Sequence, residues 1–139
     1  MIDPFDHLAL LELHAAYAHT IDDGDADGWA ACFTPEGELW STRPSEVTGR
    51  AALAEFARSR IAGPGDPERH LSWNHTFDRI DGGVTGRCSA SLARSGPEGT
   101  VLLFAATYRD RFERHDGRWC IARREVHYDN LPVGAAVTQ

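Results

Sequence analysis

The sequence predicts an α+β fold in which three N-terminal helices pack on a strongly curved antiparallel sheet. Helical patterns come first along the chain and long strand patterns follow, whereas α/β proteins alternate the two. The 139 residues are 42% hydrophobic and 25% charged, as is ordinary for one globular domain with a single core. We expect the helices to close one end of the curved sheet and to leave a cone-shaped cavity.

Helices are expected over residues 4–22, 26–33 and 50–61, with a short strand over 38–42 between the last two. Asp3 can cap the first helix, because Pro4 then takes the first helical position. Two adjacent stripes are expected to form its inward face: Leu8, Leu11, Ala15, Ala18 and Asp22, and Leu10, His14, Tyr17 and Ile21. Asp22 is an anomaly, since it ends an apolar stripe where an aliphatic residue would be expected.

The second half of the chain has the pattern of long antiparallel strands joined by turns. Strands are expected over residues 70–80, 84–94, 100–114 and 118–128. The first and last of these connections are Asp81-Gly82-Gly83 and Asp116-Gly117, both typical of hairpins. We expect the domain to span residues 1–130, with an irregular tail over 131–139.

Charge and composition exclude several classes of partner. The formal net charge is -7, from 21 acidic and 14 basic residues, which argues against a nucleic-acid-binding surface. Neither a signal peptide nor an apolar run of about 20 residues is visible. Cys32, Cys88 and Cys120 show no paired spacing and are expected to be reduced. We therefore expect a cytoplasmic protein that binds neither nucleic acid nor membrane.

Two strands carry polar residues that need an explanation. In the strand over 70–80, one face holds His70, Ser72, Asn74 and Thr76, and the other holds Leu71, Trp73, His75 and Phe77. Alternation leaves open whether the polar face meets solvent or the cavity. In the last strand, Arg124 shares a face with small and apolar residues, so it needs a carboxylate partner or an anionic ligand.

Three motifs resemble the SnoaL-like proteins of the NTF2-like fold, over roughly residues 8–129. They are Tyr17-x-x-x-Ile21-Asp22-x-x-Asp25-x-Asp27-x-Trp29-x-x-x-Phe33-Thr34-Pro35-x-Gly37, Arg69-His70-x-x-x-Asn74, and Tyr108-x-Asp110-x-Phe112-x-Arg114-x-Asp116-Gly117-x-Trp119-x-Ile121-x-x-Arg124. Among proteins of this fold, the motifs are most similar to those shared by scytalone dehydratase, bile-acid 7α-dehydratase and hexachlorocyclohexane dehydrochlorinase. The resemblance is more specific for the fold than for the activity.

The resemblance implies a catalytic Asp–His dyad. In those enzymes an Asp at the end of the first helix contacts a His that begins a central strand, and Asp22 and His70 match these positions. Tyr17 and Arg124 match a dehydratase tyrosine and an arginine that stabilises the leaving group. Such residues suit proton abstraction by His, with fixed donors where negative charge develops. The expected substrate contacts are Asn74, Tyr108, Trp40 and Phe56.

The sequence lacks one acid–base side chain of the dehydratases, which argues against dehydration as the specific reaction. Their further acid–base side chain, on the next strand, falls here in the segment 88–93, which has neither His nor Asp. We therefore expect a cofactor-free lyase, isomerase or cyclase acting on a small hydrophobic cyclic molecule such as a polyketide, terpenoid or steroid-like metabolite, and forming a homodimer or homotrimer.

Structural roles remain open for each candidate residue. Asp22 can instead cap its helix, His70 can be a structural histidine, and Tyr17 can be a core side chain. The alternative function is a non-catalytic ligand-binding module or an assembly module like a dioxygenase small subunit. No metal site is expected, because no metal-ligand spacing links the remaining histidines, which include His14, His19, His75, His115 and His127.

Overall fold

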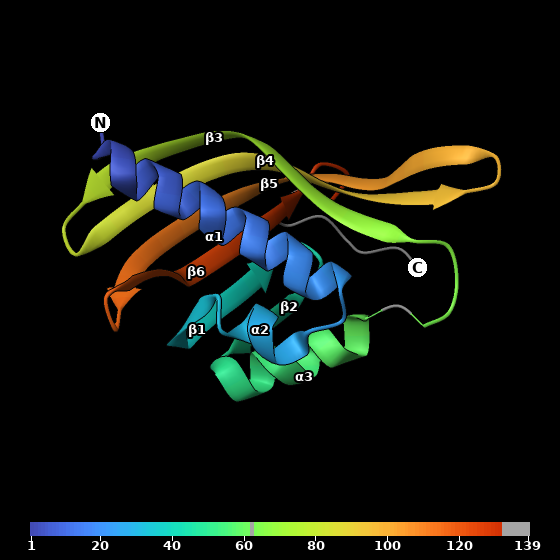
Figure 1. Cartoon of the computed structure of the whole chain (residues 1–139), viewed down its shortest axis with the longest axis horizontal. Helices are drawn as coiled ribbons and strands as arrows, with labels where there is room; N and C mark the ends of the chain where they lie inside the picture. Colours follow the sequence, from blue (N-terminus) through green and yellow to red (C-terminus); the bar gives the residue numbers. More distant parts are fainter. Residues whose placement is uncertain (62, 132–139) are drawn as a thin grey trace.

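A computed structural model describes residues 1–61 and 63–131, and its three helices precede the four long antiparallel strands, as expected (Figure 1). They are α1 (Pro4–Asp22), α2 (Ala26–Ala30), β1 (Phe33–Ser41), β2 (Ser45–Thr48), α3 (Arg50–Arg60), β3 (Glu68–Ile80), β4 (Gly83–Gly96), β5 (Gly99–His115) and β6 (Arg118–Tyr128). The predicted α+β, NTF2-like fold class is confirmed. Except for Leu131, the tail expected over 131–139 lies outside the described residues.

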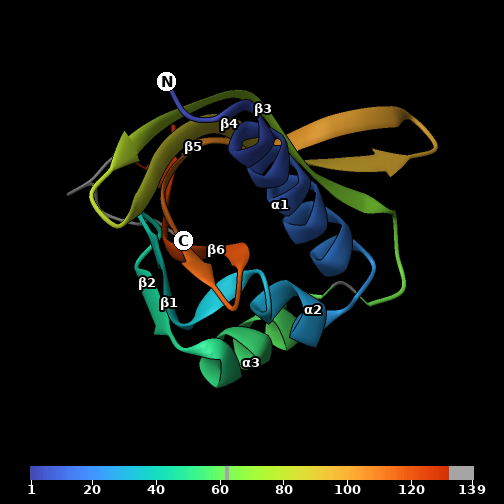
Figure 2. The same ribbon diagram turned by 60° about the vertical axis from the view of Figure 1, so that its left-hand side comes forward.

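The strands form one six-stranded sheet in the order β2-β1-β6-β5-β4-β3. Neighbouring strands are antiparallel except β1 and β6, which run parallel. The sheet is therefore mixed, not wholly antiparallel as expected. After β2 and α3 the chain crosses to β3 at the far edge, and it returns through β4 and β5 to β6, which lies beside β1. The sheet bends around the side on which α1 lies, and α2 and α3 close one end (Figure 2).

Strand pairing also explains two further differences. The second helix ends at Ala30 instead of Phe33, because Phe33 pairs with Ile121 of β6 and begins β1. The Ile121 amide donates to the Cys32 carbonyl at 2.8 Å, so the tertiary ladder overrides local helical preference here. Strand β2 was not expected; it pairs with β1 across a tight turn.

Helix α1 begins as the sequence predicts but buries a narrower face. The Asp3 carboxylate accepts from the Phe5 amide at 2.8 Å, which confirms the predicted cap. Its buried residues are Leu10, His14 and Tyr17, whereas Leu8 of the other stripe is 59% exposed. Among the described residues, no helix has the length and apolar character needed to cross a membrane.

A β-bulge in β3 changes which side chains face the inside of the sheet. The register with β4 shifts between Trp73 and Thr76, and Asn74 takes a φ of 59°, the left-handed region that Asn tolerates better than most residues. His70 therefore faces inward before the bulge, and Phe77 is buried after it. Strict period-two alternation would place these two residues on opposite faces.

Candidate active site

A cavity of about 610 Å³ lies between the curved sheet and the helices, within the usual size of small-molecule pockets. Its wall is built from α1, α2 and α3, from the segment before β3, and from the inner faces of the strands. Apolar and aromatic side chains supply much of this wall, among them Ile21, Trp29, Leu39, Phe56, Leu92, Phe104 and Val126. Asp22, His70 and Tyr17 also line the cavity.

The cavity wall brings Asp22 and His70 together. Asp22 is the last residue of α1, and His70 lies near the start of β3. The Asp22 Oδ1 lies 2.7 Å from His70 Nδ1, and both carboxylate oxygens accept from the His70 backbone amide at 3.0 and 3.1 Å. The His70 side chain is 26% exposed and that of Asp22 is 16% exposed. Because Nδ1–H donates to the carboxylate, Nε2 is left as the basic nitrogen.

Tyr17 lies on α1, five residues before Asp22, and is part of an aromatic cluster. Its ring centroid lies 5.4 Å from that of Trp29 and 6.0 Å from that of Tyr108. Burial raises the pKa of the Tyr17 phenol, although the nearby Arg124 guanidinium opposes the shift. Tyr17 is thus a neutral hydroxyl at ordinary pH, and its side chain is part of the cavity wall.

Arg124 is fully buried, as the sequence predicts, and has a carboxylate partner. Asp110 accepts from its Nε at 2.8 Å and from its Nη2 at 2.9 Å, and Nη2 lies 3.2 Å from His14 Nδ1. The guanidinium carbon lies 4.2 Å from the Tyr17 ring centroid and 4.1 Å from that of Tyr108. Contrary to the expected direct role, Arg124 is not among the residues that line the cavity, and these two aromatic rings lie against it.

Two of the four expected substrate contacts line the cavity and two do not. Tyr108 and Phe56 lie in its wall. Trp40 faces the opposite side of β1 from Leu39 and contacts the His127 ring at a centroid distance of 5.2 Å. Asn74 is exposed because of the bulge, and its Nδ2 donates to Ser89 Oγ at 3.3 Å. Trp40 and Asn74 therefore lie outside the wall of this cavity.

The structure also shows what replaces the missing acid on the strand after His70. In the β3–β4 register, the residue paired with His70 is Leu92, which lines the cavity. An apolar side chain thus takes the place directly opposite the dyad. This arrangement leaves the dyad without a second proton donor on the facing strand.

The sequence missed several residues of the site. Asp110 had a signal, because a carboxylate between Tyr108 and Phe112 on one strand face is unusual in a core. Arg43 lines the cavity from the turn between β1 and β2, where no periodicity applies. Leu39 was missed because the β1 register depends on pairing with β6.

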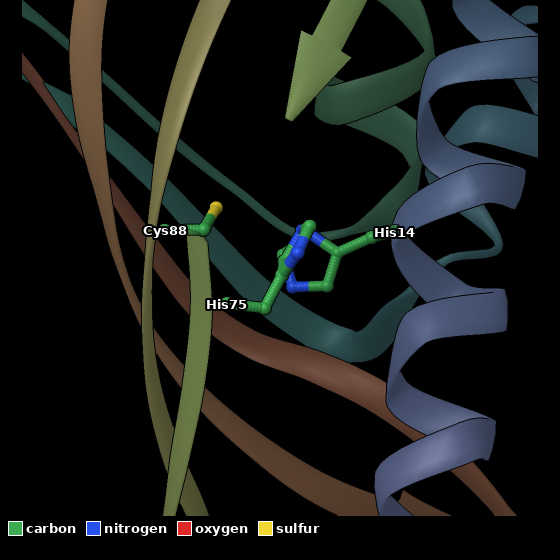
Figure 3. Close-up of side chains that lie close together, drawn as sticks. All are labelled: His14, His75 and Cys88. Carbon is green, nitrogen blue, oxygen red and sulfur yellow. The ribbon is translucent and has the colours of Figure 1, made fainter. Parts of the chain in front are cut away.

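Three potential metal ligands gather beneath α1, although the sequence spacing indicated none. They are His14, His75 and Cys88, whose ligand atoms lie within 4.8 Å of one another (Figure 3). Burial lowers the pKa of His14 to about 2, with Arg124 contributing, and raises that of Cys88 to about 12.

Hydrogen bonding argues against a metal role for this cluster. A neutral imidazole has one lone pair, and Arg124 Nη2, which can only donate, lies 3.2 Å from His14 Nδ1. The lone pair of His14 is therefore committed to Arg124. A cation bound by His14 would have to displace that guanidinium, which Asp110 holds in place. The cluster is best described as a buried packing arrangement around Arg124.

Comparisons with known proteins agree with this architecture. The structure is similar to Rv3472, a protein of unknown function from Mycobacterium tuberculosis (30% identity over 97% of this chain and 82% of that chain, TM-score 0.80). It is also similar to Aln2 from a Streptomyces species (24% identity, 94% and 96% covered, TM-score 0.85). A third is a proposed scytalone dehydratase from Novosphingobium aromaticivorans (19% identity, 96% of both chains, TM-score 0.79).

A search of the curated proteins found no match. The model of the SnoaL-like domain family matches residues 5–125, which is most of the chain. The resemblance given by the sequence motifs is therefore confirmed. The chain belongs to the SnoaL-like domain family.

Proposed function

We propose that the chain is an acid–base enzyme that uses its own side chains to move a proton on a small hydrophobic cyclic molecule. The observation that carries the proposal is the contact of 2.7 Å between Asp22 and His70 Nδ1 in the wall of a largely apolar cavity. A histidine within hydrogen-bond distance of a carboxylate in the wall of a cleft has the geometry of a general base and the group that orients it. Membership of the SnoaL-like family and the likeness to a proposed scytalone dehydratase support this class of chemistry.

His70 acts as the general base in this mechanism. Nε2 takes a proton from a carbon next to a carbonyl group, and the C–H electron pair moves to the carbonyl oxygen to give an enolate. The resulting imidazolium is stabilised by the Asp22 carboxylate through Nδ1–H. Asp22 also accepts from the His70 backbone amide, so ring and backbone are oriented together. Preorganisation of this kind avoids reorientation during proton transfer.

The enolate oxygen needs a hydrogen-bond donor, and Tyr17 is the candidate. Its phenol remains protonated because burial raises the pKa. Arg124 acts through the tyrosines instead of touching the substrate: its positive charge lies against the rings of Tyr17 and Tyr108. That charge favours developing negative charge near either hydroxyl.

Isomerisation or cyclisation fits the site better than dehydration. The expulsion of hydroxide is helped by a proton donor, and the residue paired with His70 on the next strand is Leu92. In an isomerisation, the protonated His70 returns its proton to a different carbon. In a cyclisation, the enolate carbon attacks a second carbonyl of the same molecule, and the imidazolium protonates the new alkoxide.

A neutral probe tests the base without knowledge of the substrate. Ring opening of 5-nitrobenzisoxazole requires removal of one C–H proton and releases a coloured phenolate. We expect His70→Gln to lower the rate at least about 100-fold and Asp22→Asn about tenfold or more, within the range of general base catalysis. His19→Gln, on the exposed face of α1, is the matched control. Equal rates for wild type, His70→Gln and Asp22→Asn, with all folded by circular dichroism, would refute the proposal and favour a non-catalytic ligand-binding module.

We further propose that copies of the chain associate as a homodimer or homotrimer. Leu71 and Trp73 support this, because they project from the outer face of β3 and are 42% and 41% exposed. Exposed apolar side chains of this size often mark interaction surfaces. Light scattering on the purified protein measures the state directly, and a monomer at micromolar concentration would contradict it.

A further inference from the structure

Charged side chains divide the cavity wall into two sides. The carboxylates in the wall are Asp22, Asp23, Asp66 and Glu68. All four come from the end of α1 and from the segment at the start of β3, close to the dyad. By contrast, the part of the wall supplied by β1, β2, β5 and β6 contains no described carboxylate, and its one charged residue is Arg43.

Arg43 lies against an aromatic ring instead of an acid. Its guanidinium carbon lies 5.1 Å from the centroid of Tyr128, which also lines the cavity. Within residues 1–61 and 63–131, no carboxylate oxygen lies within 4.0 Å of it. Arg94, also in the wall, is instead paired with Glu68 at 3.1 Å. The donors of Arg43 are therefore available to a ligand.

Two hydroxyl groups lie next to Arg43 on the same turn. Ser41 and Ser45 both line the cavity, and their Oγ atoms are 3.2 Å apart. Ser41 Oγ donates to the Arg43 carbonyl, which fixes the turn. The Ser45 hydroxyl can rotate its proton from Ser41 toward a ligand, since hydroxyl rotors adapt to their partners. Arg43 and Ser45 both line the cavity at this turn, and a guanidinium and a hydroxyl can both donate to a carboxylate.

This polar turn and the dyad belong to opposite edges of the sheet. Strand β3 is one edge and the β1–β2 hairpin is the other, with β6, β5 and β4 between. Four strand spacings correspond to about 19 Å along the sheet, and the curvature shortens the direct path across the cavity. The wall between them is mainly apolar and aromatic, with Leu39, Phe104 and Val126 beside Tyr108. A ligand that contacts both ends must have an apolar body between two polar groups.

We propose that the β1–β2 turn binds an anionic group of the substrate through Arg43 and Ser45. The substrate is then an apolar ring compound that carries a carboxylate, or a comparable anion, at the end remote from the carbon that His70 deprotonates. This inference rests on the proposed function for the identity of the reacting end. Arg60 does not replace Arg43, because it lies over Phe56 at the end of α3, on the helical side of the cavity.

A pair of fluorescent probes that differ in charge tests the inference. Anilinonaphthalene sulfonate is an aromatic anion, and N-phenylnaphthylamine is its neutral counterpart. For wild type we expect both to bind, and salt at about 0.5 M ionic strength to weaken only the sulfonate. Arg43→Gln should weaken the sulfonate about five- to tenfold and the neutral probe less than about twofold. Arg43→Lys should retain most of the affinity for the sulfonate, because it keeps the charge.

A second surface arginine provides the control for the loss of positive charge. Arg79→Gln removes the same charge from an exposed site on β3 outside the cavity wall and should leave both affinities unchanged. The inference would be overturned if Arg43→Gln and Arg60→Gln lowered the affinity for the sulfonate equally. It would also be overturned if Arg43→Gln lowered the affinities for both probes equally, or if the wild type bound neither probe. The proposed function is tested separately, by comparing the rates at which the wild type and His70→Gln turn over 5-nitrobenzisoxazole.

Discussion

His14 makes the stability of the fold depend on pH in a way that one substitution can isolate. Its side chain is 4% exposed, and burial, with the Arg124 charge beside it, lowers its pKa to about 2. In the unfolded chain a histidine has a pKa near 6.5. The stabilising contribution of neutral His14 is therefore fully present above pH 6.5 and is lost as the pH falls toward 2, because the unfolded state then binds a proton that the folded state does not.

The size of this effect follows from the two pKa values. Between pH 7 and pH 5 the unfolded histidine becomes almost fully protonated while folded His14 stays neutral. The free energy of unfolding should fall by about 1.9 kcal/mol from this group alone. Asn is the informative replacement, because its Oδ1 can still accept from Arg124 Nη2, as His14 Nδ1 does at 3.2 Å, while the group no longer titrates.

Urea unfolding at pH 7 and pH 5 measures the effect. His14→Asn should lower the stability at pH 7 because the side chain is smaller, yet reduce the pH 7-to-5 difference by about 1.9 kcal/mol. His75, whose pKa burial also lowers, remains in both proteins, and His14→Asn/His75→Asn compared with His75→Asn isolates the contribution of His14. An identical pH 7-to-5 difference in wild type and His14→Asn would refute the assignment of a neutral, buried His14.

Three further predictions concern groups outside the dyad. Asp110→Ala should destabilise the fold by about 3–5 kcal/mol in urea, because it leaves Arg124 buried and unpaired. Asn74→Val should cost about 1–2 kcal/mol in thermal unfolding, whereas Asn74→Gly should be tolerated, because the φ of 59° penalises a branched side chain. Cys32 and Cys88, with pKa values raised by burial to about 11 and about 12, should resist Ellman's reagent at pH 8 until urea unfolds the protein.

Local patterns in the sequence were enough to predict the fold class and most elements. Helical periodicity located α1, and the cap at Asp3 fixed its start. Strand pairing decided what local patterns could not: Phe33 begins β1 because it pairs with Ile121. The parallel β1–β6 pair could not be predicted, because no local signal states which strand returns beside β1. Such pairings depend on contacts distant in sequence, so propensity alone does not specify them.

The residues of the candidate site were likewise predictable where they had a local sequence signal, and their tertiary contacts were not. Asp22 and His70 were predictable, because each breaks a pattern and the family resemblance links the two; the structure then brings them into contact. Arg124 was predictable as a buried charge in need of a partner, but not as one held by Asp110 and covered by two tyrosine rings. A buried charge needs a counter-charge, but this requirement does not identify whether a protein group or a ligand supplies it.

The bulge at Asn74 shows how one residue changes the chemistry on both sides of a strand. Without it, alternation would place His70 and Asn74 on the cavity face and His75 on the outer face. The extra residue turns Asn74 outward, and His75 instead packs beneath α1, where its ring centroid lies 4.5 Å from that of His14. One strand thus contributes a histidine to the cavity wall and another to the core around Arg124. Removing the bulge would leave His70 in the cavity wall but turn His75 to the outer face, so the contact of His75 with His14 depends on the left-handed conformation at position 74.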